Sequence, residues 1–341
     1  GGAVMARSGR IRRAVPPSLV LFAGAFLLAA VICPLIGSPR LVLGDVIADL
    51  AGRGGHAADI LFRYRIPRVI LALLVGGTLA TVGATFQVVL RNPLAEPYTL
   101  GATGGAALGA VLAISVPSLW IQVGPFSSVQ LLALVGSAAT LGLIYALALH
   151  PAGISMNTLL LAGVTISILC GGAILLVRYL VNPSLLVQMD RWMMGGLDVV
   201  GYRDLAALFP LLLPGLGLLF MQPRSLNHLA LGAELASGHG VEVAAVQKEA
   251  FIGGGIATAA VVSLAGPIGF VGLIVPHAVR RISGFDHRIV LPASFLLGGA
   301  ALAVCDTAAR TVLSPTEMPV GIITALVGGP LFIWLLTRTA R

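Results

Sequence analysis

Three arginines stand within six residues at the start of an apolar run. Arg63, Arg65 and Arg68 occur in RYRIPR, directly before VILALLVGGTLATVGATFQVVL. A guanidinium group keeps its charge at physiological pH and matches a carboxylate through two parallel hydrogen bonds. The cluster would therefore suit the binding of acidic groups. Anchoring is the alternative, in which the arginines extend to a polar interface beside the apolar run. The residues alone do not separate the two.

Sequence motifs of catalysis are missing from the rest of the chain. Lys248 is the one lysine and no GxxxxGK[ST] pattern occurs, so the chain cannot itself carry the lysine-bearing phosphate loop of an ATPase. No HExxH or Ser/His/Asp signature is present, which argues against an enzyme. Cys33, Cys170 and Cys305 stand singly in apolar runs, so we expect buried thiols and neither disulfides nor a metal site.

The elements that must position these residues are long and apolar. Hydrophobic residues make up 57% of the chain and charged residues 10%, and the mean hydropathy is +1.00. A soluble globule of this composition could not cover its surface with polar groups, so we expect an integral membrane protein. A helix needs roughly 20 mainly apolar residues to cross a bilayer. The sequence predicts ten such helices, near 14–36, 69–90, 99–116, 128–149, 157–179, 204–221, 289–310 and 318–337, with two more inside 250–279 separated by a hinge at AGPIG.

Positive charge predicts the orientation of the chain. Loops that stay in the cytoplasm carry an excess of lysine and arginine, and the basic tail 1–13 precedes the first helix. Ten crossings would return the carboxyl terminus to the same side, whereas nine would leave it outside. Both termini are therefore predicted to be cytoplasmic, with Arg7, Arg10, Arg12 and Arg13 at one end and Arg338 and Arg341 at the other.

Glycines recur at intervals of four in GATGGAALGA, at Gly101, Gly105 and Gly109. This spacing places them on one helix face, where the missing side chains let another backbone approach closely. A nucleotide-binding loop would need a preceding strand, and none is predicted. We therefore expect close-packed helices in one compact bundle.

The polar residues within the predicted spans indicate whether transport could be coupled to an ion. A proton- or sodium-coupled transporter usually holds acids or histidines within its spans, and Asp306 is almost the only candidate here. Ion coupling is therefore the weaker alternative. Between the sixth and seventh helices, QPRSLNHLALGAELASGHGVEVAAVQKE is too rich in helix-forming residues to be a plain linker. It is either an amphipathic helix on the membrane surface or a dock for a cytoplasmic partner.

Six blocks, in this order, carry a resemblance to a known family. They are RIPRVILALLVGGTLATVGATFQVVLRNPLAEPYTLGATGGAALGA, LLLAGVTIS, RWMMGGL, LALGAELA, GPIGFVGLIVPHAVRRISGFDHRIVLP and EMPVGIITALVGGPLFIWLL. Together they resemble the iron-chelate (siderophore or haem) and cobalamin uptake permeases, the membrane subunits of type II ATP-binding-cassette importers. The resemblance covers nearly the whole chain from about residue 60.

The resemblance implies an architecture and a set of partners. It implies a single permease domain over 1–341 with ten helices, in which helices two to five and seven to ten form an inverted repeat. Two copies would form a homodimer in the bacterial inner membrane, with two ATPase subunits that carry the ATP and Mg²⁺ and a periplasmic substrate-binding protein. No catalysis, no cofactor in this chain and no nucleic acid are expected. The cargo would be a ferric siderophore or haem. Cobalamin is the alternative within the family, and an ion-coupled transporter the alternative outside it.

The resemblance also assigns roles to residues. Arg65 and Arg68 would receive one lobe of the binding protein and Arg310 the other, with Arg63 an extra charge in the same cluster. Met156 and the stretch ASGHGVEV depart from the family pattern at the gate and in the coupling segment 222–247. The coupling residues implied are Leu229, Ala230, Leu231, Gly232 and Glu234, and those of the gate and pathway are Asn92, Leu94, Ser155, Met156, Asn157, Thr165 and Ser167.

Overall fold

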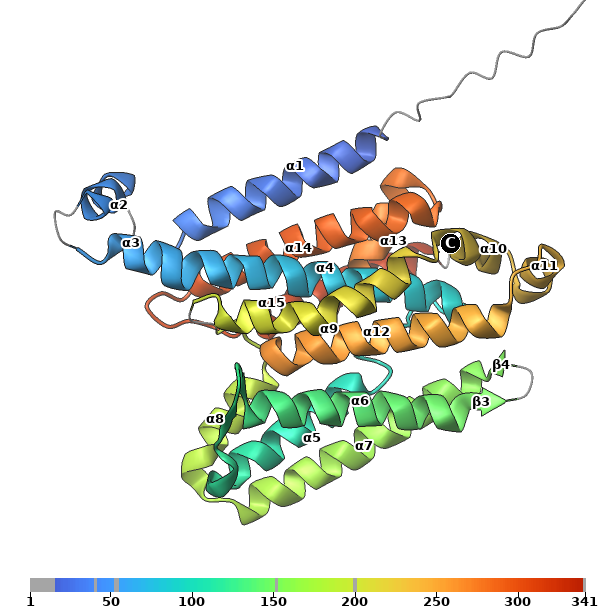
Figure 1. The fold of residues 1–341 in the computed structure, drawn as a ribbon, viewed down its shortest axis with the longest axis horizontal. Coiled ribbons are helices and arrows are strands. Elements are labelled where there is room, and N and C mark those ends of the chain that lie inside the picture. The colour runs from blue at the N-terminus through green and yellow to red at the C-terminus, as the bar shows by residue number, and fades with distance from the viewer. Residues whose placement is uncertain (1–15, 40–41, 52–54, 151–152, 199–200, 340–341) are drawn as a thin grey trace, which may run out of the picture.

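The computed structural model describes residues 16–39, 42–51, 55–150, 153–198 and 201–339 of the chain. Within these ranges the protein is a bundle of helices with two short two-stranded ribbons (Figure 1). Ten helices have 13 residues or more: α1 (Pro17–Ile32), α4 (Ile66–Val89), α5 (Ala102–Ser115), α6 (Ser128–Ala148), α7 (Met156–Leu180), α9 (Arg203–Phe220), α12 (Val243–Ala265), α13 (Val271–Ser283), α14 (His287–Thr311) and α15 (Val320–Thr339).

Shorter elements connect the long helices. The ribbons pair β1 (Gln122–Val123) with β2 (Phe126–Ser127) and β3 (Leu149–His150) with β4 (Gly153–Ile154), both antiparallel. The other short elements are η1 (Cys33–Leu35), α2 (Leu43–Leu50), α3 (Ala57–Asp59), the π-helical turn η2 (Ile60–Arg65), η3 (Pro117–Leu119), η4 (Pro183–Leu185), α8 (Leu186–Met193), α10 (Pro223–Ala230) and α11 (Ala233–Gly238).

The predicted helices are close to those observed. From the second predicted helix to the sixth and in the last two, the observed ends lie within about three residues of the predicted ones. The predicted hinge at AGPIG is confirmed, because α12 ends at Ala265 and Gly266 follows with a φ of +66°. The coupling segment predicted over 222–247 includes the first residues of α12, which begins at Val243. Its bounds stay a prediction.

Seven helical stretches of the described residues are long and apolar enough to cross a membrane: Pro17–Leu35 (α1 with η1), Ala57–Val89 (α3, η2 and α4), α6, α7, α9, α12 and α14. The apolar helices Ala102–Ser115 and Val320–Trp334 are shorter, and α13 has 13 residues. The number of ten crossings therefore stays a prediction, as does the cytoplasmic location of the termini. The basic tail 1–13 and Arg341 lie outside the described residues, and so does the side chain of Arg338.

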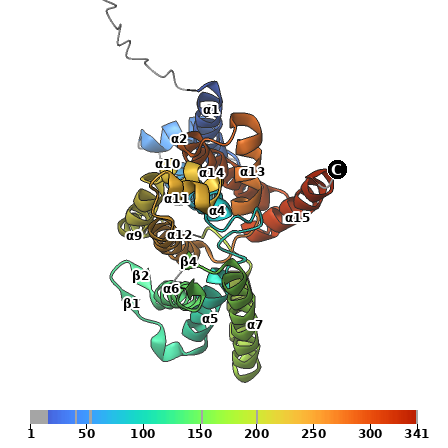
Figure 2. The ribbon, with the colours of Figure 1, turned by 90° about the vertical axis from the view of Figure 1, so that its right-hand side faces the viewer.

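Helix α4 forms the centre of the bundle. Its residues are buried along almost the whole length, including Val69, Val75, Phe86 and Val89. It packs most extensively on α14 and also contacts α12 and α13, and Figure 2 shows it in the interior with these helices around it. A helix that is apolar on all sides belongs inside a membrane protein. Whatever α4 carries at its two ends is therefore held by the core.

The two sets of four helices α4–α7 and α12–α15 share a feature that agrees with the predicted inverted repeat. In each set the second helix, α5 or α13, is short, with 14 and 13 residues respectively. Each of these helices also starts after a residue in the left-handed conformation, Gly101 with φ +81° and Phe270 with φ +69°. Shortened helices at matching positions of two halves are typical of transporters built from repeats.

The predicted glycine face packs closely against neighbouring helices. A Cβ at Gly105 would overlap the carbonyl oxygen of Gly136 in α6, and a Cβ at Gly109 would overlap that of Leu132. Gly101 instead precedes α5, where a Cβ would lie 3.1 Å from the carbonyl oxygen of Gly163 in α7. Close packing is confirmed, with α6 on the face of Gly105 and Gly109 and α7 at Gly101.

Replacing Gly109 with alanine tests this packing. The added methyl group cannot avoid the backbone of α6, so Gly109→Ala should lower the free energy of unfolding by about 1–3 kcal/mol. Gly142→Ala is the matched control, because nothing lies within 4 Å of a Cβ there and alanine favours helix. The measurement is the unfolding midpoint of both variants in detergent. Equal midpoints for the two would contradict the close approach of α5 and α6.

Candidate functional site

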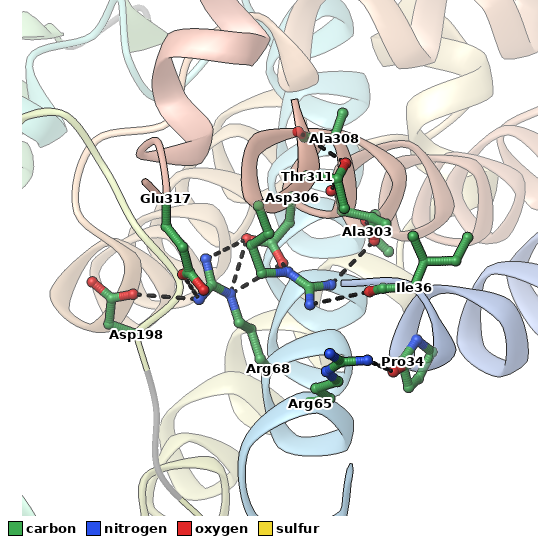
Figure 3. A network of polar contacts seen from close by, with 12 residues as sticks. Pro34, Ile36, Arg65, Arg68, Asp198, Ala303, Asp306, Ala308, Thr311 and Glu317 are labelled. Atoms are coloured by element: carbon green, nitrogen blue, oxygen red, sulfur yellow. Dashed lines mark hydrogen bonds and ion pairs between the residues drawn. The ribbon is translucent and has the colours of Figure 1, made fainter. Parts of the chain in front are cut away.

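One end of the bundle, the arginine end, holds the charged cluster predicted from RYRIPR. Figure 3 shows that its side chains come from separate parts of the chain: η2 and the first turn of α4, the last turns of α14, and the connections that contain Asp198 and Glu317. The buried apolar core on α4 and α14 brings these segments together. The cluster is thus built by helix packing and not by one loop.

Asp306 lies at the centre of this cluster. Its side chain is fully buried, and Oδ1 accepts hydrogen bonds from Nε and Nη2 of Arg68 at 3.1 and 3.0 Å. Oδ2 accepts one from Nε of Arg310 at 3.0 Å. A buried carboxylate is stable only when it is paired and hydrogen-bonded. Because both oxygens are bound by arginines, neither is free to coordinate a further cation.

Arg68 links Asp306 to two further carboxylates. Its Nη1 donates to Oε2 of Glu317 at 2.7 Å and lies 3.6 Å from Oδ1 of Asp198. The side chain is 13% exposed, whereas those of Glu317 and Asp198 are 46% and 70% exposed. Most of the hydrogen bonds that Arg68 can donate are therefore made within the protein.

Arg65 and Arg310 bind the backbone that follows the first helix. Nη1 of Arg65 donates to the carbonyl oxygens of Pro34 and Leu35 at 3.3 and 3.4 Å, and Nη1 of Arg310 donates to that of Ile36 at 3.5 Å. The two arginines are only 4% and 5% exposed. They cap carbonyl groups at the end of η1, where the helical hydrogen bonds stop.

Arg63 differs from its neighbours. It forms an ion pair with Asp59 at 3.2 Å on the surface, where the side chains are 72% and 56% exposed. Beside it lies a depression of about 460 Å³ lined by Tyr64, Arg65, Arg68, Arg310 and other residues. Of the four arginines predicted to dock a binding protein, Arg63 is exposed and the other three line or support this depression. Their docking role stays a prediction.

The opposite end of the bundle, on the right in Figure 1, carries the coupling segment as α10 and α11. Leu229 is 1% exposed and packs inside, while Leu231 is 66% exposed. Ala230 and Glu234 are also exposed, and Gly232 has a φ of +129° that favours glycine. Leu229 thus anchors the segment, and of the predicted coupling residues Ala230, Leu231 and Glu234 are exposed to a partner.

The predicted gate residues lie on two separate elements. Asn92 and Leu94 form a turn after α4, in which the Leu94 N–H donates to Oδ1 of Asn92 at 2.9 Å. Ser155 caps α7 by accepting from the Thr158 N–H at 3.4 Å, and Asn157 in the first turn is exposed. The side chain of Met156 lies outside the described residues. Further along α7, Thr165 is exposed, and Ser167 donates to the Gly163 carbonyl oxygen at 2.7 Å.

The sequence interpretation missed Glu96, in the connection between α4 and α5. This carboxylate is 4% exposed and accepts hydrogen bonds from the backbone N–H groups of Phe270 and Leu273 at the start of α13. Burial raises the pKa of Glu96 to about 7 although the two donors oppose the shift. The Glu96 side chain therefore links the predicted gate turn to the start of α13. Nothing in the local sequence, where Glu96 stands between Pro93 and Pro97, predicts this contact.

Metal-binding side chains do not gather in the part of the chain that the structure describes. No group of three His, Cys, Asp or Glu residues there could hold an ion. Cys33 and Cys170 are buried free thiols, and Cys305 is half-buried.

Comparison with known proteins identifies the family of this chain. A model of the FecCD transport family matches residues 25–338. The chain belongs to the FecCD transport family. The resemblance read from the six sequence blocks is thereby confirmed, as is an all-α membrane permease fold.

Relatives of this FecCD chain include permeases named for two different substrates and one solved transporter structure. The hemin transport system permease HmuU of Yersinia pestis is 40% identical over 322 residues, which cover 88% of this chain and 96% of the relative. The cobalamin import system permease BtuC of Halobacterium salinarum is 42% identical over 287 residues, covering 82% and 74%. A solved inward-facing structure of a metal-chelate type ABC transporter matches with a TM-score of 0.80 and 29% identity, over 95% of this chain and 99% of that one.

Replacing Asp306 tests the internal role of the arginine end. Asp306→Asn keeps the shape but leaves Arg68 and Arg310 without their shared counter-charge, so we expect a loss of about 3–5 kcal/mol in the free energy of unfolding. The matched control is Asp59→Asn, whose exposed ion pair should contribute almost nothing. The measurement is the denaturation midpoint of each variant in detergent. A native midpoint for Asp306→Asn would show that the buried cluster does not support the fold.

Proposed function

We propose that this chain is the permease subunit of an ATP-driven importer that carries a bulky metal chelate from a periplasmic binding protein into the cytoplasm. The match to the FecCD family over residues 25–338 carries the proposal. Haem or a ferric siderophore is the proposed cargo, and cobalamin the alternative. Relatives described as hemin and cobalamin permeases are 40% and 42% identical, so overall identity does not distinguish these cargoes.

The chain itself supplies no chemistry in this proposal. It lacks the lysine-bearing phosphate loop, so two ATPase subunits would bind ATP and Mg²⁺ and would rest on the coupling segment. ATP-driven closure of these subunits would move α10 and α11. Because Leu229 anchors this segment in the core, such motion would be passed to the helices. The cargo would cross without being modified.

A second copy of the chain would complete the pathway. Leu161, Ile168 and Leu175 on α7 are 70%, 69% and 68% exposed, and Thr165 lies among them as an exposed hydroxyl group. Apolar side chains on this face suit lipid or another subunit, whereas a hydroxyl group suits a pathway that polar cargo can pass. In a homodimer the two α7 helices would border such a pathway.

The proposed ion-coupled alternative is disfavoured by the same geometry. Asp306 was its best candidate for a coupling site, and both oxygens of that carboxylate are held by arginines. The arginine end is instead proposed to receive acidic residues of the binding protein, with Arg63 as the exposed charge that meets them first. Charge pairs at the rim of an interface mainly speed encounter and weaken with salt.

Reversing the charge of Arg63 tests the docking proposal without disturbing the buried cluster. The permease, its ATPase subunits and its binding protein are reconstituted in lipid vesicles, and ATP hydrolysis is measured against binding-protein concentration. Arg63→Glu should raise the half-maximal concentration by about 2- to 10-fold at low salt, and less at high salt. Basal hydrolysis should not change.

The control for this experiment is Asp59→Asn, which removes the partner of Arg63 and frees its charge. It should leave the half-maximal concentration equal or lower. If Arg63→Glu responds to the binding protein as the native chain does, then Arg63 is not part of the dock. Arg65 is unsuitable for charge reversal, because its guanidinium group is buried against backbone carbonyls.

A further inference from the structure

A basic pocket lies directly beneath the coupling segment. Its volume is about 440 Å³, and its walls come from the end of α4, the link between α10 and α11, the last turn of α13 and the start of α14. Arg91 and Arg280 contribute the charges, His287 lies beside them, and Ala230 and Gly232 form the wall shared with the coupling segment. Anything that rests on the coupling segment would also cover this pocket.

The two arginines of the basic pocket have no counter-charge within the described ranges. Neither Arg91 nor Arg280 forms an ion pair there. Nη2 of Arg280 donates to the neutral amide oxygen of Gln87, while Nη1 is buried and has no hydrogen-bond partner among these residues. A buried guanidinium group without a counter-charge is costly, and a carboxylate is the group whose geometry matches it best.

His287 adds a second unpaired nitrogen to the same pocket. The residue is 1% exposed, and its Nδ1 lies 2.7 Å from Oδ1 of Asn227. The amide of Asn227 donates to Asp286 at 2.7 Å, so its oxygen faces the histidine and Nδ1 must be the donor. Nε2 is buried and has no partner among the described residues.

The backbone at Arg91 is strained in a way that serves the pocket. The Asn92 N–H donates to the Gln87 carbonyl oxygen, and the Arg91 N–H donates to the Val88 carbonyl oxygen. This pair of hydrogen bonds is the Schellman ending of a helix, in which the residue in the left-handed conformation is usually glycine. Here that residue is arginine, with a φ of +46°. Its Nη2 lies 3.6 Å from where a Cβ on Gly232 would be. Strain of this kind persists at sites where a side chain is needed.

We propose that the basic pocket receives an acidic side chain of the ATPase subunit, whose carboxylate pairs with Arg280 and Arg91. This inference rests on the proposed function, because it assumes that an ATPase subunit covers the coupling segment. The apolar contact at Leu231 would seat the partner, and the carboxylate would fix its position on the pocket. Asp286 does not fill this role, since its Oδ1 is already bound by Asn227 and by the Arg288 N–H at 3.0 Å.

The test compares two neighbouring arginines of α13. Arg280→Gln removes the charge in the basic pocket, whereas Arg281→Gln removes an exposed charge one residue away that does not line it. The full-length permease is placed in nanodiscs of neutral lipid, and the affinity of the separately purified ATPase subunit of the same transporter is measured. We expect Arg280→Gln to weaken binding by about 10-fold, as for a lost hydrogen bond to a charged group, and Arg281→Gln by less than about 2-fold.

Arg91→Gln provides a second variant that does not depend on a buried position. Arg91 is exposed, so its replacement should preserve folding and still weaken the binding of the ATPase subunit. The fold of each variant is checked by its melting midpoint without the ATPase subunit. A lysine replacement of one acidic residue on the ATPase subunit should restore the affinity of Arg280→Glu and so identify the carboxylate.

Three outcomes would overturn the inference. Native affinity of both folded variants, Arg280→Gln and Arg91→Gln, would show that no carboxylate uses the pocket. If the variants bound the ATPase subunit more weakly than the native chain only when the nanodiscs contained anionic lipid, the pocket would be assigned to a lipid headgroup. Failure of every acid-to-lysine replacement to restore Arg280→Glu would exclude an acidic side chain. If the native permease itself bound no ATPase subunit, the proposed function would fail instead.

Discussion

Asp306 carries a negative charge where water does not reach, and the arginine end of the bundle is arranged around that charge. Its two oxygens hold Arg68 from α4 and Arg310 from α14. These arginines in turn reach Glu317 before α15 and the carbonyl group of Ile36 after the first helix. One carboxylate therefore fixes how the end of the first helix, the start of α4, the end of α14 and the connection before α15 meet at one end. The positive charges that RYRIPR displays in the sequence are largely used within the protein.

Helix α4 connects this cluster to the other end of the molecule. It begins directly after Arg65 and ends at Val89, two residues before Arg91, and it is buried between α14, α12 and α13. Its 24 residues span about 36 Å at 1.5 Å per residue. A surface proposed to receive the binding protein and a pocket proposed to receive the ATPase subunit thus lie at the two ends of one rigid, central helix. Glu96 adds a contact from the turn after α4 to the start of α13.

The sequence was informative wherever local physics decides the structure. Apolar length located the long helices, the glycine and proline in AGPIG located the break between α12 and α13, and glycine spacing predicted the close packing of α5. Contacts between distant segments could not be predicted in the same way. Arg68 and Asp306 are separated by 238 positions, and nothing local indicates that they pair. Likewise, the pattern LALGAELA did not reveal that Leu229 points inward while Leu231 points outward.

The most direct measurement of function is uptake of a labelled chelate into vesicles that contain the full complex, with binding protein outside and ATP available to the ATPase subunits. Haem, a ferric siderophore and cobalamin are compared, each with and without a protonophore. We expect one of them to accumulate only when ATP is hydrolysed, and to do so equally well after the proton gradient is collapsed. Uptake that needs no ATP and stops when the gradient is collapsed would contradict an ATP-driven permease.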